Sequence, residues 1–197
     1  MTLTTELILG GQKSGKTVRA EQLVARWLEQ DAGRRALYLA TALPWDEEMQ
    51  QRIARHQQDR ARRVPRMQTL QAAEWGGALD VPGLLRQHGA PEVALVLDCL
   101  TLWLTQQLMP LEQEDVQPVA DAARLEAAVA DLLEAIRAWP GPLYIVSNEI
   151  GLGVIPLGRE TRAFVDALGE LNQRVAAVCS HVTLMAAGLP LTLKSSD

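Results

Sequence analysis

A glycine-rich octapeptide near the N-terminus constrains the fold more than any other part of the sequence. Residues 10–17 read Gly-Gly-Gln-Lys-Ser-Gly-Lys-Thr and match the pattern G-x-x-x-x-G-K-[ST] of a phosphate-binding P-loop. An apolar run, Leu7-Ile8-Leu9, precedes the motif, and a segment with helical spacing follows it. In that context, backbone N–H groups converge on a phosphate where the helix begins, and the helix dipole favours the anion. The motif therefore predicts nucleotide binding, without specifying the reaction.

The positions of the motif have separate predicted tasks. The residues assigned to the phosphate-binding loop are Gly10, Gly11, Gln12, Lys13, Ser14 and Gly15. Lys16 is expected to reach the β- and γ-phosphates, and Thr17 to offer its hydroxyl to Mg²⁺. Asp98 ends the apolar run 93–97 and is predicted to hold the same ion, as a Walker B carboxylate does. The other interpretation is that Asp98 caps the helix that begins after it, and the two roles are compatible.

Apolar strands alternate with amphipathic helices along the chain. Buried strands are expected at 7–9, 36–40, 93–98 and 143–147, with weaker strand patterns at 67–70, 182–186 and 191–194. Helices are expected from the P-loop to about residue 33 and at 46–62, 76–87, 100–108, 118–139 and 161–178. This alternation predicts an α/β sandwich with a mostly parallel sheet, as a single P-loop nucleotide-binding domain over residues 1–197. Because parallel strands end at one edge, we expect Gly10, Thr41, Asp98 and Asn148 to share a crevice.

Charge and composition limit the classes of partner that the chain can bind and the compartment in which it is expected. The formal net charge of −5 argues against nucleic acid as a partner, since a duplex-binding surface needs a basic footprint. No window approaches about 18 uninterrupted apolar residues, and no basic region with a long apolar stretch opens the chain. We therefore expect no membrane span and a cytoplasmic location. Cys99 and Cys179 lack C-x-x-C spacing and are expected to be reduced thiols.

A histidine lies in the predicted helix 46–62. At about 100° per residue, His56 and Arg60 fall on the same side of this helix. The spacing alone favours a packed, half-buried imidazole. The alternative is that the neutral ring attacks a phosphorus atom while Arg52, Arg55 and Arg60 offset the charge of the phosphates.

Two further features also have alternative interpretations. The basic cluster of Arg60, Arg62, Arg63 and Arg66 is either a solvated helix face or a surface that steers phosphates. The loop that starts with Asn148 and Glu149 contains two glycines, so it either wraps closely around a substrate or forms a purely structural turn.

These motifs resemble one family, the bifunctional adenosylcobinamide kinase / adenosylcobinamide-phosphate guanylyltransferases of cobalamin biosynthesis. The resemblance spans nearly the whole chain. It rests on residues 10–17, 38–41, 46–49, 52–56, 147–156 and 172–175, together with the strand that ends in Asp98. The segment Asn-Glu-x-Gly-x-Gly at 148–153 is the most specific of these. Asp98 stands where the family often has Glu.

The resemblance implies two successive reactions, with ATP and GTP as substrates. The terminal hydroxyl of adenosylcobinamide first takes the γ-phosphoryl of a nucleoside triphosphate. GTP then transfers GMP to that phosphate through a covalent guanylyl-histidine, which by position is His56. A three-layer P-loop NTPase fold of the RecA-like kind and a homotrimer are implied as well. A monofunctional P-loop kinase that acts on another small alcohol is the alternative.

Overall fold

One mixed sheet forms the centre of the molecule. The computed structural model describes residues 4–71, 79–109 and 122–196. The strands in these ranges form a seven-stranded sheet in the order β3-β2-β4-β5-β1-β6-β7. Their bounds are β1 (Thr5–Gly10), β2 (Arg35–Ala40), β3 (Met67–Gln71), β4 (Val93–Asp98), β5 (Leu143–Val146), β6 (His181–Ala186) and β7 (Leu189–Ser195). All neighbouring pairs are parallel except β6 and β7. The predicted α/β fold with a mostly parallel sheet is confirmed.

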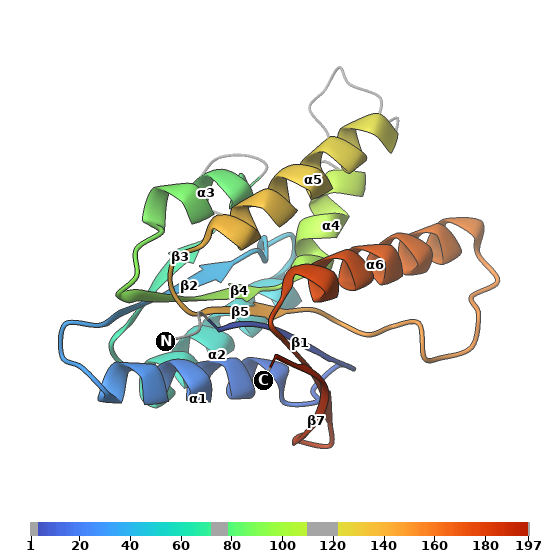
Figure 1. The fold of residues 1–197 in the computed structure, drawn as a ribbon. Helices are drawn as coiled ribbons and strands as arrows, with labels where there is room; N and C mark the ends of the chain where they lie inside the picture. Colours follow the sequence, from blue (N-terminus) through green and yellow to red (C-terminus); the bar gives the residue numbers. More distant parts are fainter. Residues whose placement is uncertain (1–3, 72–78, 110–121, 197) are drawn as a thin grey trace.

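Helices cover both faces of the sheet (Figure 1). One layer contains α1 (Lys16–Glu29) and α2 (Glu47–Arg63). The opposite layer contains α3 (Val81–His88), α4 (Leu100–Leu108), α5 (Ala122–Ala138) and α6 (Arg159–Val178). The result is the three-layer arrangement that the family resemblance implies.

The central strands explain why the core divides into two parts. Side chains alternate between the two faces of a strand, and β4 is apolar on both. Leu95 and Leu97 pack in the cluster that includes Trp103 of α4, whereas Ala94 and Val96 pack in the cluster under α1. The continuous apolar run therefore places β4 in the interior of the sheet. Asp98, its last residue, lies at the carboxyl end of this central strand.

One predicted helix begins later than expected. The pattern predicts a start at residue 76, but α3 begins at Val81, and residues 79 and 80 precede it. Asp80 is the N-cap residue, and its carboxylate accepts a 2.9 Å hydrogen bond from the Gly83 backbone N–H. Pro82 occupies the first turn, where a missing N–H is tolerated. Residues 76–78 and 118–121 of two predicted helices lie outside the described residues.

The two cysteines are reduced thiols, as the sequence predicts. Cys99 and Cys179 are both free and buried. Burial is the main cause that raises the pKa of Cys99 to about 11 and the pKa of Cys179 to about 12. Within the described ranges, no helix combines the length and apolar character needed to cross a membrane.

Candidate functional site

The carboxyl ends of four strands are joined at one edge of the sheet. Thr41 follows β2, and its backbone N–H donates to the Asp98 carbonyl of β4 at 3.0 Å. The Thr41 hydroxyl accepts a 2.7 Å hydrogen bond from the Cys99 N–H. After β5, the Glu149 N–H donates to the Gly10 carbonyl of β1 at 3.1 Å. These strand ends therefore meet as predicted, but of Gly10, Thr41, Asp98 and Asn148 only Asp98 and Asn148 line the cleft above them.

A cleft of about 710 Å³ opens over these strand ends. Most of the predicted site residues line it: Gln12, Lys13, Ser14, Gly15, Lys16, Thr17, Arg52, Arg55, His56, Asp98 and Asn148. Gly10, Gly11 and Glu149 are predicted site residues that do not line the cleft. The Glu149 carboxylate instead accepts a 2.9 Å hydrogen bond from the Gly151 N–H in its own loop. The cleft thus brings His56 of α2 and Lys16 of α1 to the same cavity.

Close packing requires glycine at two positions of the P-loop. Gly10 and Gly15 have φ values of +149° and +102°. A Cβ on Gly10 would lie 2.5 Å from the Met185 carbonyl oxygen of β6. The turn between β6 and β7 also supports the loop, because the Gly188 N–H donates to the Ser14 carbonyl at 3.0 Å. The P-loop is held by its own strand and by the C-terminal hairpin.

Lys16 is folded onto the P-loop backbone. Its ammonium donates to the carbonyl oxygens of Gly10 at 2.9 Å and Gly11 at 2.6 Å. Burial lowers the pKa of Lys16, and the Asp98 carboxylate opposes this shift. The backbone contacts hold the cation at the site predicted to bind phosphates.

A carboxylate and two hydroxyl groups meet beside Lys16. The Thr17 hydroxyl donates to Oδ2 of Asp98 at 2.8 Å, and the Tyr38 hydroxyl donates to the same oxygen at 2.5 Å. Cys99, not Asp98, is the N-cap residue of α4, and the Asp98 carboxylate faces Thr17. The helix-capping alternative for Asp98 is therefore wrong.

The donor set at Asp98 suits a hard cation. Thr17 and Asp98 offer only oxygen atoms, and Mg²⁺ prefers oxygen ligands while keeping several waters and phosphate oxygens. The part of the chain that the structure describes has no group of three or more His, Cys, Asp or Glu residues able to hold a metal alone. Thr17 and Asp98 would therefore hold Mg²⁺ together with the phosphates of a bound nucleotide.

The residues alone did not single out Tyr38 as part of the site. Tyr38 lies two residues before the end of β2, and the parallel register that pairs Ala40 with Asp98 sets its hydroxyl against the carboxylate. Burial, reinforced by the Asp98 charge, raises the pKa of Tyr38 well above its ordinary value. The phenol therefore stays protonated and remains a donor to Asp98.

The histidine-bearing helix is polar and borders the cleft. Asp46 caps α2 by accepting a 2.7 Å hydrogen bond from the Met49 N–H. His56 is exposed, so the packed, half-buried imidazole favoured by the spacing is wrong. Arg60 is the one buried residue of α2, and it lines the cleft with His56.

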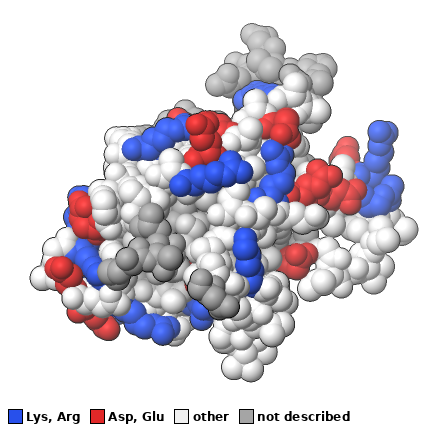
Figure 2. All heavy atoms as spheres, in the orientation of Figure 1, with Lys and Arg blue, Asp and Glu red and all other residues white. Residues whose placement is uncertain are grey.

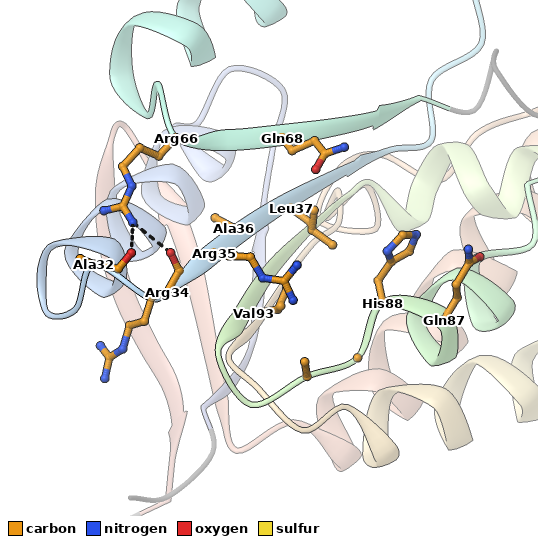
Figure 3. Close-up of a pocket in the computed structure, with 12 residues that line it drawn as sticks. Ala32, Arg34, Arg35, Ala36, Leu37, Arg66, Gln68, Gln87, His88 and Val93 are labelled. Carbon is orange, nitrogen blue, oxygen red and sulfur yellow. Dashed lines mark hydrogen bonds between the residues drawn. The ribbon is translucent and has the colours of Figure 1, made fainter.

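The basic cluster has no single role. The Arg63 guanidinium pairs with the buried Glu21 carboxylate of α1. Arg66 donates to the carbonyl oxygens of Leu28, Ala32 and Arg34, each at 3.0 Å (two of these bonds appear in Figure 3). Of the four arginines, only Arg60 lines the cleft.

Arg66 borders a second hollow of about 570 Å³ (Figure 3). Arg35, Gln68 and Val93 line this hollow, and they lie at the amino ends of β2, β3 and β4. His88 at the end of α3 faces it. This hollow lies at the amino ends of the strands, whereas the P-loop lies at their carboxyl ends. Ligands of open α/β sheets bind beyond the carboxyl ends, so the P-loop cleft is the candidate active site.

Asn148 is fixed between two helices. Its N–H and its side-chain amide donate to the Thr101 hydroxyl of α4 at 3.1 and 3.0 Å. The Asn172 amide of α6 donates to the Asn148 carbonyl at 3.1 Å. Thr101 was not predicted, because a helical threonine has no sequence pattern that reveals its contact with a strand end. The chain beyond Asn148 extends away from the sheet before it enters α6 (Figure 1).

Comparison with known proteins identifies similar sequences over almost the full length. Residues 6–193 match the family model described as cobinamide kinase / cobinamide phosphate guanyltransferase. The chain is 41% identical over 189 residues to the bifunctional adenosylcobalamin biosynthesis protein CobP of Pseudomonas aeruginosa, covering 96% of both chains. It is 34% identical over 192 residues to the bifunctional adenosylcobalamin biosynthesis protein CobU of Salmonella typhimurium, covering 95% of this chain and 98% of the relative.

A solved structure resembles the fold. The flagellar accessory protein FlaH from Methanocaldococcus jannaschii has a TM-score of 0.50 and 11% sequence identity, covering 98% of this chain and 79% of that protein. This likeness concerns the architecture alone.

Proposed function

The chain belongs to the cobinamide kinase / cobinamide phosphate guanyltransferase family, and we propose that it phosphorylates adenosylcobinamide and then attaches GMP to the product. The observation that carries this proposal is the placement of His56 and Lys16 on one cleft. A P-loop lysine serves phosphate binding, whereas a histidine on the same cavity offers a nucleophile for a second transfer.

The kinase step needs charge neutralisation more than covalent chemistry by the protein. The terminal hydroxyl of the aminopropanol arm attacks the γ-phosphorus of ATP, a P–O bond to ADP breaks, and the hydroxyl proton is released. Lys16 and the backbone N–H groups of the loop bind the phosphates and orient them. Thr17 and Asp98 would hold Mg²⁺, which would supply further positive charge beside these phosphates.

The guanylyl step proceeds through a covalent bond to His56. A neutral imidazole nitrogen attacks the α-phosphorus of GTP, an N–P bond forms, and the bond to pyrophosphate breaks. A phosphate oxygen of adenosylcobinamide phosphate then attacks the same phosphorus. The P–N bond breaks, its electron pair returns to the imidazole, and adenosylcobinamide-GDP is released. The exposure of His56 supports this role, because both attacks need an accessible ring.

Labelling with GTP that carries a radioactive α-phosphate tests the proposal. We expect acid-labile label on the wild-type protein and none on His56→Asn, which should still phosphorylate adenosylcobinamide with ATP. The matched control is His88→Asn, since His88 borders the hollow at the other edge of the sheet. Absence of label on the wild-type protein would leave only the monofunctional kinase.

We also propose that the enzyme is a homo-oligomer, a trimer by its resemblance to the family. Three side chains of the edge strand β7 support this: Leu189, Leu191 and Leu193 are 71%, 57% and 55% exposed. Leu152 and Val154 in the loop after β5 are 79% and 96% exposed. In Figure 2 the hairpin tip at the bottom of the view has no charged side chain on this face. Large exposed apolar patches are typical of contact surfaces between subunits.

A further inference from the structure

Arg60 is a buried cation that forms no ion pair with any residue in the described ranges. Its residue exposure is 3%. Its Nε and Nη2 groups donate to the Thr69 hydroxyl at 3.2 and 2.9 Å. Its guanidinium carbon lies 3.7 Å from the centroid of the Tyr38 ring. A hydroxyl and an aromatic face therefore hold the guanidinium, and neither neutralises it.

Glu21 is the carboxylate on which the Arg60 charge acts, but no ion pair joins the two residues. Glu21 pairs with Arg63, and Asp98 accepts hydrogen bonds from Thr17 and Tyr38. A buried charge is costly unless a counter-charge approaches it. Because Arg60 lines the nucleotide cleft, the counter-charge that fits is an anion that enters the cleft from solution.

The position of Arg60 on α2 indicates which anion this is. Arg60 follows His56 by four residues, so their Cβ atoms lie about 5–6 Å apart on one helix face. Within the described residues, the Nη1 group of Arg60 has no hydrogen-bond acceptor. A guanidinium binds phosphate oxygens through two N–H groups, and this face is where a phosphate on His56 would lie.

We propose that Arg60 forms a second phosphate subsite, separate from the P-loop, that binds the α-phosphate of the guanylyl group on His56. This inference rests on the proposed guanylyl transfer and adds a residue to it. Once pyrophosphate has left, the attack by adenosylcobinamide phosphate brings two anionic phosphates together. Arg60, fixed by Tyr38 and Thr69, reduces their repulsion without having to move.

Binding of GMP and of guanosine to the full-length protein, measured by calorimetry, tests the subsite. The two ligands differ only in the phosphate, so the ratio of their dissociation constants reports the phosphate contact. We expect the wild-type protein to prefer GMP, and Arg60→Gln to reduce this preference about 10-fold or more. Arg60→Lys should reduce it several-fold, because an ammonium lacks the planar fork. The control is Arg62→Gln on the exposed side of α2, which should keep the wild-type preference.

A purely structural role for Arg60 gives a different result. If Arg60 only anchors α2, its loss weakens GMP and guanosine alike and the ratio does not change. An unchanged ratio in every Arg60 variant that folds would overturn the proposal, and so would a wild-type protein that does not distinguish the two ligands. Covalent labelling by GTP tests the guanylyl-histidine independently of the binding ratio. A wild-type protein that prefers GMP through Arg60 but takes no label would contradict the guanylyl-histidine, not the subsite.

Discussion

The hydroxyl of Thr17 donates a 2.8 Å hydrogen bond to Oδ2 of Asp98, although 81 positions separate the two residues in the sequence. Tyr38 donates to the same oxygen, so α1, β2 and β4 meet at a single atom. This contact connects the P-loop helix to the centre of the sheet. Replacing Asp98 or Tyr38 should therefore affect this site in different ways.

Replacing the carboxylate of Asp98 should impair both reactions. Asp98→Asn keeps the size of the side chain but removes the negative charge proposed to hold Mg²⁺, and we expect kcat to fall on the order of 100-fold. Asp98→Glu retains the carboxylate, so it should keep most of the activity. Steady-state assays at saturating Mg²⁺ measure both variants. Equal activity of Asp98→Asn and the wild-type protein would contradict a metal role.

Tyr38→Phe isolates the contribution of one hydrogen bond. The variant leaves the Asp98 carboxylate with Thr17 but without the phenol that orients it. Because groups that orient a metal ligand typically change affinity about 10–100-fold, we expect the Mg²⁺ concentration for half-maximal activity to rise about 10-fold. Excess Mg²⁺ should restore kcat. Failure of excess Mg²⁺ to restore activity would indicate that Tyr38 acts in another way.

Arg63→Ala should destabilise the protein in a pH-dependent manner. Arg63 balances the carboxylate of Glu21, whose side chain is 1% exposed. Removing one partner of a fully buried pair costs roughly 3–5 kcal/mol, and we expect about 2 kcal/mol at pH 7 because Arg63 is itself 36% exposed. Urea unfolding measures the loss, with Arg62→Ala as the exposed control.

The pH dependence of this variant has a defined sign. Burial raises the pKa of Glu21 above its ordinary value of 4.5, while Arg63 opposes the shift. Above that value the folded state binds more protons than the unfolded state, so the free energy of unfolding falls as the pH rises through the window between the two pKa values. Without Arg63 the pKa of Glu21 in the folded state rises further, so the window between the two pKa values widens. The destabilisation of Arg63→Ala should therefore be smaller at pH 5 than at pH 7.

The two thiols should be inert in the folded protein. Cys99 and Cys179 are 7% and 2% exposed, and burial raises their pKa values to about 11 and about 12. A disulfide reagent at pH 8 should find no reactive thiol in native protein and two after denaturation, since the thiolate is the nucleophile. Rapid reaction of either native thiol would contradict this assignment.

Changing the edge strand should affect assembly before it affects chemistry. Leu191→Lys places a charge in the exposed apolar face of β7, and we expect the proposed oligomer to dissociate. Light scattering coupled to gel filtration measures the mass. Thr192→Lys is the matched control, because neighbouring residues on a strand point to opposite faces. A monomeric wild-type protein would contradict the oligomer itself.

Periodicity and the P-loop motif predicted most of the architecture. The apolar run of β4 requires burial on both faces, and the motif at 10–17 requires a strand before it and a helix after it. These constraints act between neighbouring residues, so a single sequence contains them. The start of α3 was missed because the effects of Asp80 and Pro82 on the first turn outweighed the apolar spacing.

Contacts between distant elements were harder to predict. The sequence places Arg60, Arg62, Arg63 and Arg66 in one basic cluster, and only the packing of α2 on α1 and the sheet separates their partners. The hydrogen bond from Tyr38 to Asp98 likewise depends on the register of two strands. Side-chain periodicity gives the face on which a residue lies, but it does not give the residue opposite.

The hydrogen bond from Gly188 to Ser14 also bears on how the protein can be shortened. A chain cut after Ala186 would retain the whole phosphate-binding motif and yet lose the turn that supports it. Truncation before Gly188 should therefore weaken nucleotide affinity at a motif encoded near the opposite end of the gene.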